Sequence, residues 1–171
     1  MSLRNVLSYL AGSFVLFILG PALILYLATL WHYTFMPEGY GSVIFGGLSS
    51  AVGLLFIIWS NYELIKKGHG GAVVIGSIKL SDETIKLVTT GPYSMCRNPM
   101  HLGVVLFYLG LCCAINSLIT LIVPLMTLLL AYLFAIFLDE PRLKRDFKEE
   151  YEKWACDVPQ RFWPKARNNK N

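Results

Sequence analysis

The fold of this chain is decided by residues 98–138, which read NPMHLGVVLFYLGLCCAINSLITLIVPLMTLLLAYLFAIFL. This run contains no Asp, Glu, Lys or Arg. As a single helix it would extend roughly 60 Å, about twice the hydrocarbon thickness of a bilayer. Asn116-Ser117 is the natural break within it. The run therefore predicts two antiparallel membrane spans, over about 99–115 and 118–138, joined by a very short connection.

Two further charge-free blocks, residues 5–37 and 39–62, precede this run. Each is long enough for one span of about 20 apolar residues, and we expect these spans over about 6–30 and 42–62. Gly20-Pro21 falls inside the first of them, where proline should kink the helix and leave carbonyls that neighbouring helices must satisfy. Because 55% of the 171 residues are hydrophobic, we expect one all-α integral membrane domain of about four spans.

The basic residues test this span count independently of hydropathy. All 15 lie in three places: Arg4, the connector 63–98 between the second and third spans, and the region from Arg142 onward. An even number of spans puts all of them on one side, as the positive-inside rule requires. We therefore expect a multi-pass protein with cytoplasmic termini. The alternative for the first block is a signal peptide, but it is longer than a typical h-region and has no clear cleavage site.

Charge and cysteine usage narrow the range of partners. The net charge of +4 reflects this topology and attraction to anionic membrane lipids, so no nucleic-acid partner is expected. The four cysteines form no Cys-x-x-Cys pair, and with three histidines they show no metal-ligand spacing. We expect reduced thiols and no metal. The oligomeric state is left open.

An amphipathic helix is predicted after the fourth span, over about 140–156. Leu143, Phe147, Tyr151 and Trp154 recur there at helical spacing, and charged residues fill the other face. Such a helix on the cytoplasmic side could pack on the membrane or on protein. It could also roof a site built at the ends of the third and fourth spans.

Polar groups bracket the 98–138 run at both ends. Arg97 is a permanent cation with a planar fork, Asn98 and His101 add hydrogen-bonding groups, and Pro99 fixes the backbone. The acidic pair Asp139-Glu140 ends the antiparallel partner span, so the two groups must meet. They could hold a zwitterionic or cationic cofactor. The alternative is an ion pair between Arg97 and one of the acids that only anchors the helix ends.

A set of motifs in this order and span context resembles the isoprenylcysteine carboxyl methyltransferase and phospholipid methyltransferase superfamily. The resemblance covers about 85–164 and rests on Leu87-Val88-Thr89-Thr90-Gly91-Pro92-Tyr93, Arg97-Asn98-Pro99-Met100, Asp139-Glu140-Pro141-Arg142-Leu143, Phe147, Tyr151, Val158-Pro159 and Pro164. It implies an integral membrane enzyme that binds S-adenosylmethionine between the cytoplasmic ends of its last spans. The methyl group would pass to a lipophilic acceptor that enters from the bilayer.

The resemblance also implies the site residues. The catalytic residues would be Arg97, His101 and Glu140, with His101 or Glu140 as the base if the acceptor is an amine. The cofactor would be surrounded by residues from each motif, namely Ile85, Lys86, Leu87, Val88, Tyr93, Asn98, Pro99, Met100, His101, Asp139 and Glu140.

Three positions depart from the superfamily pattern. His101 stands where tyrosine is usual. Asp139 stands where the superfamily has the first glutamate of a Glu-Glu pair, so this side chain is shorter by one methylene. Ala135 stands where the prenylcysteine enzymes place an arginine that holds the substrate carboxylate. We therefore expect the acceptor to be a phospholipid amine or another small apolar nucleophile, and not a prenylcysteine carboxylate.

Two other functions compete with methyl transfer. An NADPH-dependent enzyme similar to the membrane sterol reductases would share the arginine-proline box, but those proteins are much longer and have more spans. A non-catalytic membrane scaffold would use the Arg97 ion pair only as a helix clamp.

Overall fold

The computed structural model of the chain describes residues 3–31, 33–37, 39–68 and 85–164. Part of the expected connector, residues 69–84, and the end of the basic tail lie outside the described residues. Within the described ranges every regular element is a helix, as the composition predicted. Three of these helices are long and apolar enough to cross a membrane, and a shorter apolar helix accompanies them.

The first span is one helical path of three elements: α1 (Leu3–Phe14), a π-helical turn η1 (Val15–Leu19) and α2 (Gly20–Leu30). Pro21 lacks an N–H, so the regular hydrogen-bond ladder cannot continue through the turn before it. The Tyr108 hydroxyl lies 3.4 Å from the Val15 carbonyl and 3.3 Å from the Leu16 carbonyl, to which it can donate. The π-helical turn therefore lies where Pro21 removes a donor from the ladder, and Tyr108 reaches two of its carbonyls, of which that of Val15 also accepts the Gly20 N–H.

The helices expected to form the second and third spans pack face to face through small residues. They are α3 (Tyr40–Glu63), which continues as the π-helical turn η2 (Leu64–Gly68), and α4 (Pro99–Ile115). A Cβ atom added at Gly53 would lie 2.6 Å from the Gly103 carbonyl oxygen, so the backbones touch at this crossing. The Ser50 hydroxyl donates to the Phe107 carbonyl at 3.2 Å. This close approach is typical of glycine-mediated packing in lipid.

The turn after α4 is built around Asn116, where the sequence predicted the break. Its backbone is left-handed, with φ of 55°, which asparagine tolerates better than most residues. Its side-chain oxygen accepts hydrogen bonds from the backbone N–H of Phe35 and of Met36, and its amide nitrogen donates to the Met36 carbonyl. The turn therefore also fastens the connection between the first two spans.

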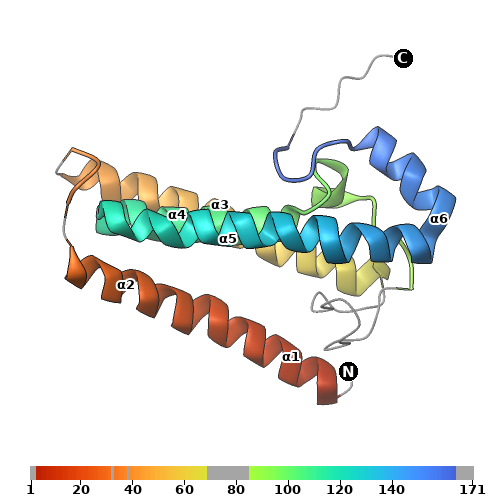
Figure 1. The fold of residues 1–171 in the computed structure, drawn as a ribbon, viewed down its shortest axis with the longest axis horizontal. Coiled ribbons are helices and arrows are strands. Elements are labelled where there is room, and N and C mark those ends of the chain that lie inside the picture. The colour runs from red at the N-terminus through yellow and green to blue at the C-terminus, as the bar shows by residue number, and fades with distance from the viewer. Residues whose placement is uncertain (1–2, 32, 38, 69–84, 165–171) are drawn as a thin grey trace.

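The fourth span comprises η4 (Leu118–Leu121), α5 (Ile122–Phe134) and the π-helical turn η5 (Ala135–Asp139), and it runs directly into α6 (Glu140–Asp157). The expected amphipathic helix is bent, because Lys148 has non-helical backbone angles of φ 43° and ψ −116°. The first part of α6 extends the line of α5, and the second part turns back over residues 85–98 (Figure 1).

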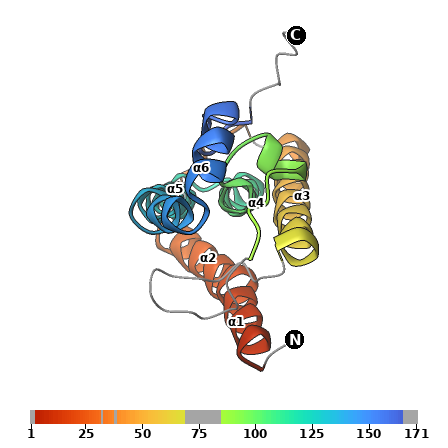
Figure 2. The same cartoon turned by 90° about the vertical axis from the view of Figure 1, so that its right-hand side faces the viewer.

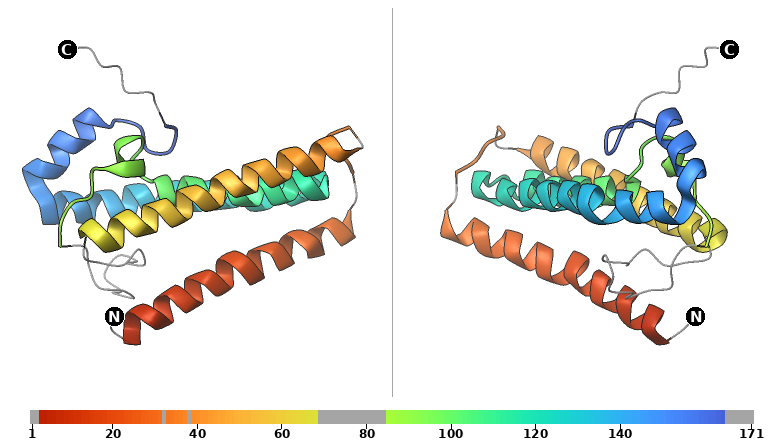
Figure 3. Two further views of the ribbon diagram at one scale, coloured as in Figure 1. Left: turned by 180° about the vertical axis from the view of Figure 1, so that it is seen from behind. Right: turned by 45° about the vertical axis from the view of Figure 1, so that its right-hand side comes forward.

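The charged residues at the helix ends lie together at one end of the molecule. α3, α4 and α5 lie alongside one another, and the α1–α2 path runs beside this group (Figure 2). α3 ends, α4 begins and α5 passes into α6 at the same end, where the N-terminus also lies (Figures 1 and 3). We call this the charged end, because Lys66, Lys67, Arg97 and the acidic pair lie there. Residues 33–37 and Asn116-Ser117 lie at the opposite end (Figure 1).

Candidate active site

A cavity at the charged end, here called the site cavity, joins segments from four parts of the chain. It holds about 90 Å³ and lies between the start of η2, residues 86–101, the η5–α6 junction and the returning part of α6. Its walls are formed by Leu64, Lys86, Leu87, Val88, Tyr93, Arg97, Asn98, Pro99, Met100, His101, Asp139, Arg142, Leu143 and Trp154.

Most of the residues expected from the sequence line this cavity, but two do not. Ile85 is 75% exposed, and Glu140 faces a neighbouring cluster of arginines. Four lining residues were not expected as site residues: Leu64, Arg142, Leu143 and Trp154. The helical spacing of Leu143 and Trp154 was a usable signal, because it predicted an amphipathic helix that could cover a site at the ends of the spans. Nothing in the sequence distinguishes Leu64 from the other residues of the expected connector 63–98.

One wall of the site cavity is a short 3₁₀ turn, η3 (Gly91–Ser94). Gly91 has φ of +62°, and a Cβ atom there would lie 2.9 Å from Cγ of Glu63, so glycine is required. The Thr90 hydroxyl donates to the Glu63 carboxylate at 2.9 Å, and the Lys67 ammonium lies 2.7 Å from the same oxygen. These contacts fasten the turn to the end of α3.

The returning part of α6 forms the roof. Tyr151 and Trp154 are buried against Val88 and Tyr93, and the Trp154 indole donates to the Tyr93 carbonyl at 3.2 Å. Burial raises the pKa of the Tyr93 phenol, so this side chain stays neutral at physiological pH. The amphipathic helix therefore covers a site and does not lie free on the membrane.

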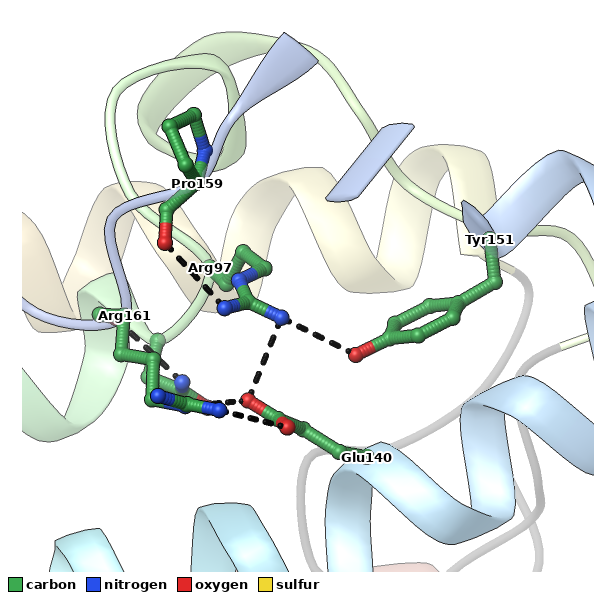
Figure 4. Close-up of polar contacts among 6 residues, drawn as sticks. Arg97, Glu140, Tyr151, Pro159 and Arg161 are labelled. Atoms are coloured by element: carbon green, nitrogen blue, oxygen red, sulfur yellow. Dashed lines mark hydrogen bonds and ion pairs between the residues drawn. The ribbon is translucent and has the colours of Figure 1, made fainter. Parts of the chain in front are cut away.

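Arg97 is held at the edge of the cavity by contacts on two sides (Figure 4). One terminal nitrogen lies 3.2 Å from the Tyr151 hydroxyl and 3.2 Å from Oε1 of Glu140. The other donates to the Pro159 carbonyl at 3.2 Å. The guanidinium is therefore fixed in orientation, and its side chain is only 11% exposed.

Glu140 lies between two arginines. Nε of Arg161 is 2.6 Å from Oε1 of Glu140, and a terminal nitrogen of Arg161 is 3.1 Å from Oε2, which is a bidentate pair (Figure 4). Hydrogen bonding to this carboxylate raises the pKa of Arg161. The Arg97–Glu140 ion pair that the sequence offered as an alternative is thus present, and Arg161 extends it to three residues.

Backbone pairing strengthens this Arg97–Glu140–Arg161 cluster. The Arg97 N–H donates to the Gln160 carbonyl at 2.9 Å, and the Asn98 N–H donates to the Arg161 carbonyl at 2.8 Å. The Asn98 side-chain amide also reaches the Arg161 carbonyl, at 3.3 Å. Residues 159–161 are therefore part of the site's frame, although only Pro159 among them belongs to the motifs of the resemblance.

A family model for phospholipid methyltransferases matches residues 41–150, well over half of the chain. This chain belongs to the phospholipid methyltransferase family. No curated protein matches it in a sequence comparison. The matched range takes in α3, α4, α5 and the first part of α6, and with them most of the site cavity. The protein is therefore an integral membrane methyltransferase, which favours this function over the reductase and scaffold alternatives.

The side chains of this methyltransferase fit a zwitterionic cofactor by their chemistry. Nε of Arg97 is buried and has no hydrogen-bond partner among the described residues, so it offers a donor for a carboxylate. The Asp139 carboxylate lines the same cavity and suits an ammonium group or hydroxyls. Leu87, Val88 and Leu143 supply apolar walls for a flat ring.

The packing around position 135 explains why this chain carries an alanine there. Ala135 is fully buried and packs with Ala131 and Phe162. The ring of Phe162 therefore occupies the surroundings in which the prenylcysteine enzymes would carry an arginine. A long cationic side chain at this position would have to displace Phe162.

Proposed function

We propose that this protein transfers the methyl group of S-adenosylmethionine to a phospholipid amine or a similar small nucleophile that reaches the charged end from the bilayer. The observation that carries the proposal is the site cavity itself. It brings together the Leu87-Val88 pair, Tyr93, the 97–101 box and Asp139, which lie up to 52 positions apart in the sequence. Family membership supports the same reaction class.

Each residue has a distinct part in holding the cofactor. Arg97 would bind its carboxylate, Asp139 its ammonium or ribose hydroxyls, and the apolar walls its adenine. The cavity of about 90 Å³ is smaller than the roughly 300–1,000 Å³ of ligand pockets. Binding therefore requires the roof to move outward, and the bend at Lys148 is the place where α6 can do so without disturbing α5.

The bound cofactor would supply a methyl group on a sulfonium, which a nucleophile can displace in line. The chain's own residues then need to align the acceptor and exclude water. Trp154 and Leu143 close the cavity from the side of the roof. An amine acceptor must also lose a proton. His101 is the better placed of the two expected bases, because it lines the cavity, whereas Glu140 is engaged by two arginines.

The acceptor class is tested with membranes that contain defined lipids. We expect the purified protein, given labelled S-adenosylmethionine, to label an aminophospholipid and to leave a farnesylcysteine analogue unlabelled. The physical reason is that a substrate carboxylate in a low-dielectric site needs a paired cation, and position 135 supplies none. Robust labelling of farnesylcysteine with none of the aminophospholipid would contradict this acceptor.

The orientation in the membrane is a second expectation, with the charged end in the cytoplasm. Cys156 is an exposed thiol at the charged end, and Tyr40→Cys in a Cys156→Ser background places one at the other end. An impermeant maleimide should reach these two thiols from opposite sides. Background from Cys96 should be low, because burial raises its pKa to about 11 and keeps it a thiol. Labelling of both positions from one side would contradict the topology.

A further inference from the structure

A second and larger hollow, here called the α5 groove, lies on the outside of the fourth span. It holds about 520 Å³ and is lined by α5 on one side and by the segment after α6 on the other. The α5 wall consists of Leu125, Leu128, Leu129 and Tyr132, which share one helix face at spacings of three, one and three. The opposite wall is residues 159–163.

The groove runs along α5, with its polar part at the charged end. Tyr132 lies seven residues and Leu125 fourteen residues before Asp139, which places them roughly 10 Å and 20 Å along the helix from that end. The leucines therefore lie within the hydrocarbon region. Arg161 and Trp163 line the groove nearer the interface, where tryptophan and arginine are typical of membrane proteins.

The residue that closes the inner side of the groove is Phe162. It is buried against Ala131 and Ala135, and its ring centroid lies 6.3 Å from that of Tyr132. The segment 159–163 is thereby fixed to α5, and the groove is a built feature of the fold. The pairing of Arg97 and Asn98 with residues 160 and 161 holds the same segment from the other side.

The charge at the mouth of the groove is positive. Arg97 and Arg161 share the single carboxylate of Glu140, so the cluster carries one net positive charge. The Arg161 side chain is 38% exposed, and the described lining of the groove includes no acid. A cation between spanning segments at the cytoplasmic face attracts lipid head groups.

We propose that the α5 groove binds one phospholipid, with its phosphate at Arg161 and an acyl chain along the Leu125–Tyr132 face. The lipid matches the groove in both respects: its anionic group lies at the interface and its apolar chain points into the bilayer. This site is separate from the site cavity, and its existence does not depend on methyl transfer. Occupation by a helix of a second copy of the chain is the competing outcome.

The test compares two adjacent residues of α5 with equal exposure. Leu129 and Leu130 are each 49% exposed, but only Leu129 lines the groove. Leu129→Trp should fill the groove, and Leu130→Trp is the matched control. Wild type and both variants are placed in nanodiscs that contain a phospholipid with a photoreactive diazirine in one acyl chain. Crosslinked peptides are then mapped by mass spectrometry.

We expect crosslinks at residues 125–132 and 159–163, reduced about tenfold in Leu129→Trp and unchanged in Leu130→Trp, which corresponds to about 1.4 kcal/mol of binding. Equal crosslinking in the two variants would overturn the proposal. A covalent or native dimer in place of lipid adducts would do the same.

A second arm tests the phosphate and needs no variant, so it holds even if a substitution impairs folding. A diacylglycerol with the same photoreactive chain but no phosphate is compared with the phospholipid on the wild-type protein. We expect crosslinking of the groove by the phospholipid to exceed that by the diacylglycerol by at least about threefold. Equal crosslinking would show that Arg161 does not recognise the phosphate and would overturn the proposed mode of binding.

Discussion

Glu140→Ala should lower the stability of the solubilised protein by about 2 to 3 kcal/mol, because it leaves two arginines without their shared carboxylate. The Glu140 side chain is 21% exposed, and that of Arg97 is 11% exposed, so water can only partly replace the lost contacts. The same change should weaken binding of S-adenosylhomocysteine by about tenfold, because Arg97 would lose its fixed orientation. Thermal unfolding in detergent and calorimetric titration give the two values.

Glu152→Ala is the matched control for this prediction. Glu152 lies in the same helix as Glu140 and pairs with Lys144 of that helix at 3.2 Å, but the Glu152 and Lys144 side chains are 60% and 65% exposed. Exposed pairs contribute about 0–1 kcal/mol, so this variant should unfold almost like wild type and bind with unchanged affinity. If both variants had the same thermal midpoint, the Arg97–Glu140–Arg161 cluster would not be the structural element that we describe.

Gly46→Ala and Gly47→Ala should have opposite effects, although the two residues are neighbours in α3. A Cβ atom at Gly46 would lie 2.5 Å from the backbone N of Ala114 and 2.5 Å from the Gly110 carbonyl oxygen, so α3 and α4 would have to separate. Overpacking of this kind costs about 2 kcal/mol or more. At Gly47 a Cβ atom would meet nothing within 4 Å, and alanine should gain about 0.5 kcal/mol through helix propensity.

Thermal midpoints of the two glycine variants in one detergent decide this prediction. Because Arg97 and Asn98 directly precede α4 and Pro99 to His101 begin it, separation of α3 from α4 should also reduce cofactor binding in Gly46→Ala. Equal midpoints for both variants would mean that the α3–α4 crossing is looser than the structure shows.

The spans could be predicted from sequence because the bilayer imposes a simple requirement on the chain. A helix in hydrocarbon needs about 20 residues without charge, so the charge-free blocks marked the helices directly. α4 coincides with the expected 99–115, and Asn116 ends it where the break was placed. The kink expected at Gly20-Pro21 takes the form of a π-helical turn directly before Pro21, which is consistent with its one missing N–H.

Two features of the site could not be predicted in this way. Lys148 is neither glycine nor proline, so nothing local marks the bend in α6, which follows the burial of Tyr151 and Trp154 against residues 85–98. Arg161 lies 21 positions from Glu140, and their pairing depends on the path of the segment after α6. In both cases tertiary packing determines the geometry, and no periodic sequence pattern predicts it.

Binding of S-adenosylhomocysteine to the purified, detergent-solubilised protein tests the central claim most directly. Calorimetry should show binding to wild type, a loss of about tenfold or more in affinity for Asp139→Asn, and no change for Asp157→Asn. Asp139 lines the site cavity, whereas Asp157 is exposed at the end of α6. No binding to folded wild type, or equal affinity in both variants, would contradict the assignment of the site cavity as the cofactor site.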